Sequence, residues 1–328
     1  ARADLAPAAG RDEPDDGEKH ETSDHERALE DVGPGHGEEA AGGDVDEDDS
    51  EPEQRARVVV PVEEVFEGLS IFLSISIWET RPAMNYRRLC KAGPMASEIG
   101  FGGGPLRGLD WGPVDNETSV QALHRALELG VTFFDTADAY GNGRSERVIG
   151  RALKGRREEV ILATKGGWWY VGGKAYADLS FLYLYRAAEE SLRFLQTDRI
   201  DLYQIHDPGL EAIRRGEVFD LLDRLKEEGK IRWAGASVDT VEEGLLCIRS
   251  ERIDVLRVYY NILDQRPDPE LFEAAQEAGV GIVVKTPLAR GLLTGKYRPD
   301  TAFPEGDFRG EWQREGRLQE ILQQVEGG

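Results

Sequence analysis

The sequence predicts an α/β protein with a (β/α)8-type barrel, here of about seven β/α units. Three observations support this fold. Short apolar runs recur along the chain, stretches with a helical period separate them, and polar residues stand where the runs end. Alternating strands and helices imply right-handed βαβ units around a parallel sheet. Seven such units in one series favour a barrel over an open, doubly wound sheet.

The expected strands are short, rich in β-branched and aromatic residues, and bounded by glycine, aspartate or charged residues. In order, they cover residues 97–103, 131–136, 159–165, 200–206, 231–237, 254–260 and 280–286. The expected helices cover residues 116–130, 144–155, 185–196, 218–229, 241–249 and 269–279. The first helix opens on a good capping residue, Asn116, and closes at Gly130.

An acid, a phenol, an amine and an imidazole stand at or just after the ends of successive expected strands: Asp135, Tyr140, Lys165 and His206. In a barrel, the chemistry lies at the C-terminal ends of the strands. A cation such as Lys165 stabilises the phenolate form of Tyr140, and Asp135 can hold the lysine protonated. His206 can then orient or protonate a carbonyl oxygen. Such a site suits hydride transfer, for which the hydride must come from a cofactor.

These residues lie in segments that resemble the aldo-keto reductase superfamily, over roughly residues 84–328. The segments are FFDTADAYGNGRSERVIGRAL, ILATKGG, TDRIDLYQIHDP, GKIRWAGAS and VVKTPLARGLLTGKY. The resemblance implies a TIM barrel and an oxidoreductase that reduces aldehydes or ketones, or oxidises alcohols or aldoses. It implies Tyr140 as the general acid/base, assisted by Asp135, Lys165 and His206. The alternative is a non-catalytic cofactor-binding or sensor protein on the same barrel, or an inactive fragment.

The resemblance also implies NADP(H) as the cofactor, with NAD(H) as the alternative. The stretch from Lys285 to Tyr297 resembles a loop that wraps the pyrophosphate, where Gly291 and Gly295 let backbone amides approach an anion. The expected cofactor contacts are Ser237, Arg257, Lys285, Thr286, Pro287, Leu288, Gly291, Leu292, Gly295 and Lys296. Three positions depart from the usual family pattern, with Val238 in place of Asn, Arg257 in place of Gln, and Lys285 in place of an aromatic residue.

The expected substrate is a small carbonyl compound or alcohol. Four aromatic residues are candidates for its apolar wall, with packing against barrel loops as the alternative: Trp111, Trp168, Trp169 and Tyr170. The glycine-rich run at 100–105 is only superficially a dinucleotide fingerprint, because Pro105 follows the glycines and no helix starts promptly. We interpret this run as the loop after the first strand.

The two ends of the chain carry separate expectations. The resemblance does not extend to the family's eighth unit, which binds the adenosine 2′-phosphate and ribose. We therefore expect a C-terminally truncated barrel that binds NADPH weakly or not at all. Residues 1–57 hold 20 acidic and 6 basic side chains and no aromatic residue. This composition predicts a disordered acidic tail, with an interaction tail as the alternative. Residues 58–83 are expected to be a linker with a strand-like apolar segment at 69–78, and residues 84–328 to be the barrel.

Composition also excludes several classes of partner. The net charge of −23 disfavours nucleic-acid binding. The apolar segment at 69–78 is too short to span a membrane, which takes about 20 residues. Cys90 and Cys247 show neither a disulfide framework nor a metal-binding spacing, which favours a reducing, cytoplasmic setting. His124 lies within an expected helix and is interpreted as an ordinary helix residue, so no metal site is expected.

Overall fold

Seven strands form a central sheet in the order β11, β10, β9, β8, β5, β4 and β3, and every neighbouring pair is parallel. The computed structural model describes residues 84–108 and 111–327. The strands are β3 (Phe101–Gly102), β4 (Phe133–Asp135), β5 (Ile161–Gly166), β8 (Ile200–His206), β9 (Ile231–Ser237), β10 (Val255–Tyr259) and β11 (Gly281–Lys285). Each lies within or within one residue of a strand predicted from the sequence, so the predicted α/β architecture is confirmed.

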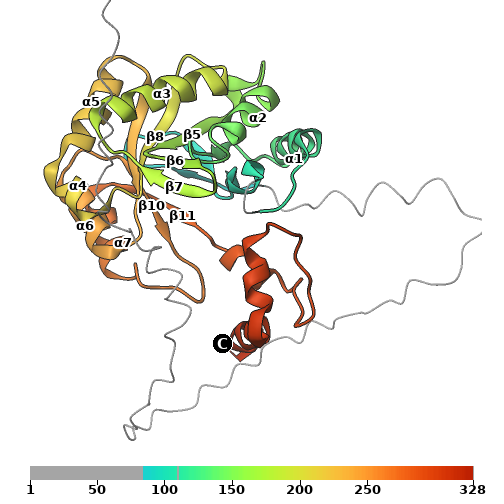
Figure 1. Cartoon of the computed structure of the whole chain (residues 1–328). Coiled ribbons are helices and arrows are strands. Elements are labelled where there is room, and N and C mark those ends of the chain that lie inside the picture. The colour runs from blue at the N-terminus through green and yellow to red at the C-terminus, as the bar shows by residue number, and fades with distance from the viewer. Residues whose placement is uncertain (1–83, 109–110, 328) are drawn as a thin grey trace, which may run out of the picture. The chain divides into compact units, whose positions relative to one another are not determined.

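The sheet is curled, and helices follow its outer side (Figure 1). Within the described residues, β3 and β11 are its two edges, so the strands form an incomplete barrel. The helices are α1 (Asn116–Glu128), α2 (Arg144–Ala152), α3 (Phe181–Leu195), α4 (Gly209–Arg215), α5 (Glu217–Glu227), α6 (Val241–Arg249), α7 (Glu270–Ala278) and α8 (Arg317–Gly327). The predicted tail at 1–57 and linker at 58–83 lie outside the described residues.

Short elements fill the connections between these strands and helices. Two antiparallel hairpins join β1 (Tyr86–Arg88) to β2 (Met95–Ser97) and β6 (Trp168–Val171) to β7 (Lys174–Ala177). Four 3-10 helices are η1 (Gly104–Arg107), η2 (Arg157–Glu159), η3 (Ala289–Thr294) and η4 (Phe308–Gly316). The sequence reasoning did not predict the second hairpin, because its residues lack an alternating apolar pattern.

Capping side chains set two helix starts differently from the prediction. The α1 cap is Asp115 rather than Asn116, because the Asp115 carboxylate accepts a hydrogen bond from the Thr118 amide at 2.7 Å. Helix α3 begins at Phe181, four residues before the predicted start, because the Ser180 hydroxyl accepts from the Tyr183 amide. The aromatic run that opens α3 favours a strand locally, and the cap together with burial of Leu184 overrides that preference.

Side-chain alternation along the strands separates two apolar cores. One core lies between the sheet and the helices, and its members include Phe134, Leu162 and Leu256. The other lies inside the curl, where Phe133, Ile161, Ala163, Leu202 and Val255 meet Leu89, Cys90 and Ala96 from the first hairpin region. That hairpin region contacts the N-terminal ends of β4 and β11. The inside of the curl is therefore apolar and closed at the N-terminal ends of the strands.

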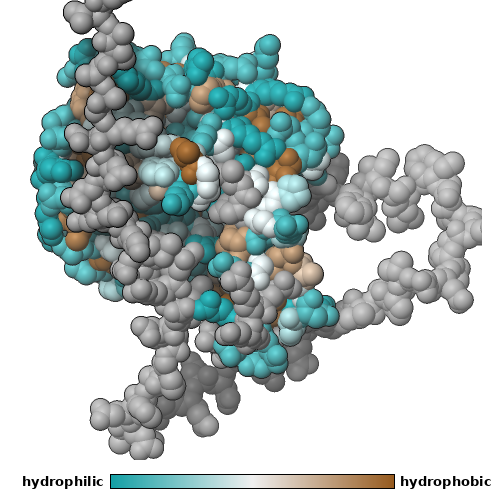
Figure 2. Space-filling model, in the orientation of Figure 1, coloured by the Kyte–Doolittle hydropathy of each residue, from teal (hydrophilic) through white to brown (hydrophobic). Residues whose placement is uncertain are grey.

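The face of the described part that Figure 2 shows is mostly polar. Figure 2 shows hydrophilic residues over most of the face seen there, with hydrophobic residues in separate groups. Among the described residues, helices that combine enough length with enough apolar character to cross a membrane are absent.

Helix α2 approaches α3 closely at Gly150, where an added Cβ would lie 2.6 Å from the Phe194 carbonyl oxygen and 2.7 Å from the Leu195 carbonyl carbon. We expect Gly150→Ala to lower the free energy of unfolding by roughly 1–3 kcal/mol, despite the better helix propensity of alanine. The matched control is Gly102→Ala, where an added Cβ meets no atom within 4 Å. Urea unfolding measures both variants, and equal stability of the two would contradict the close packing.

Candidate active site

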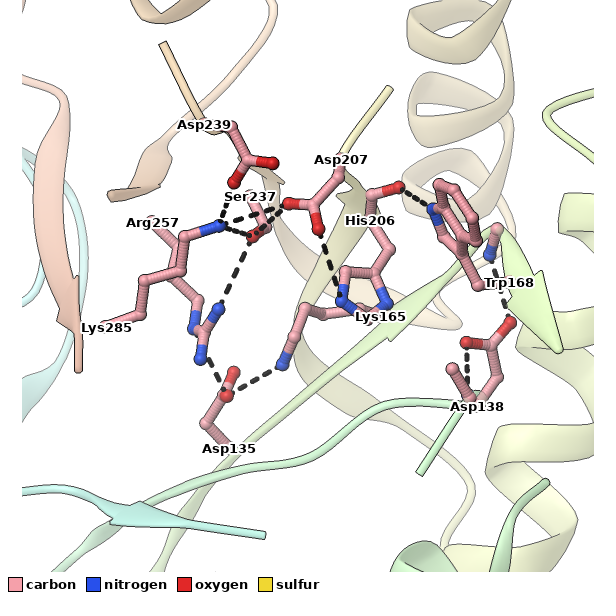
Figure 3. Close-up of polar contacts among 12 residues, drawn as sticks. Asp135, Asp138, Lys165, Trp168, His206, Asp207, Ser237, Asp239, Arg257 and Lys285 are labelled. Carbon is pink, nitrogen blue, oxygen red and sulfur yellow. Dashed lines mark hydrogen bonds and ion pairs between the residues drawn. The ribbon is translucent and has the colours of Figure 1, made fainter. Parts of the chain in front are cut away.

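On the inward face of the sheet, the side chains at the C-terminal ends of the strands are polar. Along β4, Asp135 follows Phe133, and along β5, Lys165 follows Ala163. Strand register aligns these ends, because Lys165 pairs with Gln204, His206 with Ser237, Ser237 with Arg257, and Tyr259 with Lys285. Figure 3 shows the resulting cluster of charged and polar groups.

Asp135 lies at the centre of one half of this cluster. Its Oδ2 accepts from Lys165 Nζ at 2.7 Å and lies 3.4 Å from Arg257 Nε, and its Oδ1 accepts from Gln204 Nε2 at 2.9 Å. Lys165 is fully buried and Asp135 nearly so. Burial by itself would raise the pKa of the Asp135 carboxyl, but Lys165 and Arg257 hold that pKa below its ordinary value. The carboxylate is therefore ionised and shared by three donors.

Tyr140 lies on the loop between β4 and α2, with its half-buried ring facing this ion pair. Lys165 Nζ lies 5.0 Å from the centre of the phenol ring, and the His206 ring meets it edge-on at 5.9 Å between centroids. The Asp138 amide donates to the Lys165 carbonyl at 2.9 Å, which ties the tyrosine loop to β5. The structure thus brings together all four residues that the sequence predicts for proton transfer.

His206 is a neutral imidazole in this site. Burial lowers the pKa of His206 to about 3, and the nearby Asp207 carboxylate only partly opposes that effect. Its Nε2 lies 3.8 Å from Asp207 Oδ2, and its buried Nδ1 has no hydrogen-bond partner among the described residues. A neutral imidazole has one donor and one acceptor nitrogen, so His206 can present an N–H to an oxygen acceptor without changing its charge.

A second group of ions occupies the other side of the cluster. Lys285 Nζ donates to Asp239 at 2.7 Å, to Asp207 at 3.2 Å and to Ser237 Oγ at 3.3 Å. It also lies 4.1 Å from the centre of the Tyr259 ring. Ser237 Oγ donates to Asp207 at 2.9 Å and accepts from Arg257 at 3.4 Å. Three of the predicted cofactor contacts therefore bind protein groups: Ser237, Arg257 and Lys285.

The predicted pyrophosphate loop has an unusual backbone. Thr286, Ala289 and Arg290 have φ values of 57°, 45° and 57°, and Gly291 and Gly295 follow with φ of 102° and 70°. Left-handed residues in close succession are unusual outside glycine, and such strain gathers at ligand clamps. The amides of Ala289 and Gly291 donate within the loop, to the carbonyls of Thr286 and Leu288 at 2.9 and 2.8 Å. The remaining predicted cofactor contacts differ in exposure. Leu292 is buried, whereas Pro287, Leu288 and Lys296 are exposed.

This loop fits the pyrophosphate of a dinucleotide. The loop carries two basic side chains, Arg290 and Lys296, and a Cβ at Gly291 would lie 2.6 Å from the Tyr297 hydroxyl at a backbone φ of 102°, so the position favours glycine. At the phosphate end, the two cations would suit an anionic group. At the nicotinamide end, the side chains already bind one another.

The second hairpin, β6–β7, holds the two loops of the site in place. Asn142 and Tyr170 exchange two hydrogen bonds, from Asn142 Nδ2 to the Tyr170 carbonyl at 2.7 Å and from the Tyr170 amide to Asn142 Oδ1 at 2.9 Å. Trp168 Nε1 donates to the His206 carbonyl at 2.8 Å. Trp168 therefore lies beside the site, and the main chain of Tyr170 anchors the loop of Tyr140.

Two predicted substrate-wall residues pack elsewhere. The Trp169 ring meets those of Tyr176 and Tyr183 at 5.9 and 5.0 Å, and it lines a cavity of about 670 Å³ beside α2 and α3. Trp111 meets Phe308 edge-on at 5.2 Å and lies under the Arg309 guanidinium. Sequence reasoning weighed packing as the alternative for these residues, and the contacts of Trp169 and Trp111 correspond to that alternative.

Gln204 is a member of the site that the sequence reasoning missed. It is fully buried, donates to Asp135, and leaves its Oε1 without a partner among the described residues. The available signal was its position two residues before His206 on the same strand, which places both side chains on one face. Across residues 84–108 and 111–327, groups of three or more His, Cys, Asp or Glu side chains that could hold a metal ion are absent.

Comparison with known proteins relates this arrangement to one family. The model of the aldo/keto reductase family matches residues 98–326. The chain is 33% identical over 228 residues to aldo-keto reductase YhdN of Bacillus subtilis, covering 69% of each chain. It is 36% identical over 221 residues to aldo-keto reductase yakc [NADP(+)] of Schizosaccharomyces pombe, covering 64% of each. The holo structure of aldo-keto reductase AKR11C1 from Bacillus halodurans is similar with a TM-score of 0.59 and 38% identity, covering 67% of this chain and 72% of that one.

Asp138 provides a pH test of the tyrosine loop. Its carboxyl accepts the amides of Ala139 at 2.6 Å and Gly167 at 3.0 Å, and burial raises the pKa of Asp138 to about 7. A raised carboxyl pKa means that the folded state prefers the protonated form, so the stability it contributes falls as pH rises from the unfolded-state pKa toward 7.

We therefore expect the free energy of unfolding of the wild type to fall relative to Asp138→Asn by roughly 2–4 kcal/mol between about pH 4 and pH 8. Urea unfolding across this range measures the difference. The control is Asp198→Asn, since the Asp198 side chain is 88% exposed, and its difference from wild type should stay flat. A flat difference for Asp138→Asn as well would contradict the proposed protonation of Asp138.

Proposed function

The chain belongs to the aldo/keto reductase family, and from this premise we propose that it is an NAD(P)H-dependent enzyme that reduces small aldehydes or ketones, or runs the reverse oxidation. Family membership makes it an oxidoreductase acting on carbonyl or alcohol groups. The observation that carries the finer proposal is the position of the Tyr140 ring, which lies 5.0 Å from Nζ of the fully buried Lys165 and meets the neutral His206 ring edge-on.

In this proposal, Tyr140 is the general acid in carbonyl reduction and the general base in the reverse direction. A bound nicotinamide cofactor supplies the hydride. Lys165, held by Asp135, stabilises the phenolate that remains when Tyr140 gives its proton to the carbonyl oxygen. His206 donates an N–H to the same oxygen and fixes its direction. Removing water from this buried cluster strengthens each of these interactions.

We infer that the loop from Thr286 to Lys296 holds the pyrophosphate of the cofactor. Its left-handed backbone and the cations Arg290 and Lys296 support this assignment. The relative yakc [NADP(+)] is named for this cofactor, which favours NADP(H), with NAD(H) as the alternative. Trp168, which lies beside His206, is proposed to form part of the wall of the substrate site.

A cytoplasmic setting is part of the same proposal. Cys90 and Cys247 are both free and buried, and their side chains belong to the two apolar cores. Buried thiols in apolar surroundings need no oxidising compartment, and their packing is that of small hydrophobic side chains.

Substitution of Tyr140 tests the proposal. We expect Tyr140→Phe to lower the NADPH-dependent reduction of a simple aromatic aldehyde by about 100-fold or more, because the proton donor is lost. NADPH binding, measured by quenching of protein fluorescence, should persist. The control is Tyr176→Phe on the exposed hairpin, which should keep its activity.

The outcomes separate the candidate functions. Equal turnover by Tyr140→Phe and wild type would remove Tyr140 from the chemistry. Cofactor binding without turnover in the wild type would favour a sensor on the same barrel. Absence of NADPH binding would contradict the assignment of the loop from Thr286 to Lys296.

A further inference from the structure

Arg257 crosses the interior of the curled sheet. It belongs to β10, yet its Nε lies 3.4 Å from a carboxylate oxygen of Asp135 on β4. Strands β5, β8 and β9 separate these two strands in the sheet. Only a long side chain directed across the curl can make this contact, and 15% of the Arg257 side chain remains exposed. Figure 3 shows the guanidinium between Asp135 and Ser237.

The same guanidinium joins the two halves of the site. Its Nη1 lies 3.4 Å from Ser237 Oγ, which in turn contacts Asp207 and Lys285. On the opposite side, Asp135 bonds Lys165, whose Nζ faces the Tyr140 ring. A chain of charged contacts therefore runs from β11 to the tyrosine through Arg257.

We propose that Arg257 is a positioning residue of the acid–base site, holding the Asp135 carboxylate so that Lys165 stays directed at Tyr140, rather than a contact of the nicotinamide. This proposal rests on the proposed reductase function. The guanidinium fork is rigid and always charged, which suits it to fix a carboxylate in a buried site.

Charge balance in the cluster supports this role. The charged groups that face Asp135 are Lys165 from β5 and Arg257 from β10, and the polar Gln204 faces it from β8. Burial opposes ionisation of Asp135, and Lys165 and then Arg257 are the charges that hold its pKa below the ordinary value. Loss of Arg257 would leave one cation to overcome burial, so Asp135 would take up a proton at a higher pH. A protonated Asp135 cannot hold the Lys165 ammonium by charge.

The test compares Arg257→Gln, Arg257→Lys and the control Arg252→Gln. Arg252 forms ion pairs with Asp220 and Asp223 outside the site. We expect Arg257→Gln to lower kcat for aldehyde reduction about tenfold or more, with the acid limb of the pH profile displaced upward by about one unit. The Kd for NADPH should stay within about twofold of wild type, since the cofactor contact is not made by Arg257. Arg257→Lys should restore part of kcat and the position of the acid limb.

Unfolding gives a readout that does not depend on turnover. The low pKa of Asp135 stabilises the fold at neutral pH, and that contribution is lost as pH falls through the folded-state pKa. In Arg257→Gln, the loss should begin about one pH unit higher than in wild type or in Arg252→Gln. If Arg257→Gln fails to fold, Arg257→Lys decides the question. An acid limb of its pH profile at the wild-type position supports the proposal, and an acid limb displaced from that position argues against it.

Two results would overturn the inference. One is a large increase in the Kd for NADPH with kcat unchanged, which would make Arg257 a cofactor contact. The other is an acid limb and a pH dependence of unfolding identical to wild type. If wild type itself turns over no aldehyde, the proposed function fails, and the unfolding series still decides whether Arg257 holds Asp135.

Discussion

The buried ion pair between Asp135 and Lys165 is the interaction on which the site depends. A fully buried ammonium is stable only beside a well-placed carboxylate, since removal of either partner would leave an uncompensated charge in an apolar interior. The pair lies directly above the inner apolar core, with Phe133 and Ala163 below it on the same strands. Strands β4 and β5 are direct neighbours in the sheet, and their pairing brings the two strand ends close enough to form it.

Around this pair, cations and anions alternate across the C-terminal end of the sheet. The cluster is balanced in charge, because three cations form ion pairs with three carboxylates: Lys165, Arg257 and Lys285 with Asp135, Asp207 and Asp239. This balance of charge explains how six charged side chains can be largely shielded from solvent. It also explains the neutral His206, because the cations around it add to burial in lowering its pKa. These six charged groups lie at or close to the C-terminal ends of six strands, β4, β5, β8, β9, β10 and β11.

Hydrogen bonds to the main chain connect this cluster to the loops. The β6–β7 hairpin joins the loop of Tyr140 through Asn142 and the end of β8 through Trp168. Asp138 fastens the same loop to the residue that follows β5. These contacts restrict the positions of the phenol and the imidazole without touching either ring, and restricted geometry is what a proton-transfer site requires.

Most of the fold and the positions of the candidate proton-transfer residues follow from the sequence, because both rest on local patterns. Apolar runs at regular spacing predict parallel strands, and Asp135, Tyr140, Lys165 and His206 stand at their ends where a barrel places chemistry. Gln204, the β6–β7 hairpin and the cap at Asp115 required the structure, since hydrogen bonds to partners elsewhere decide them.

The contacts of Ser237, Arg257 and Lys285 illustrate what only the tertiary structure decided. The family resemblance implied that these residues contact a cofactor, and the structure adds that they also bind one another and Asp135, Asp207 and Asp239. Strand-end position is a property of the local sequence. The partner of a long charged side chain is set by the curl and register of the sheet, which bring together residues more than a hundred positions apart, such as Arg257 and Asp135.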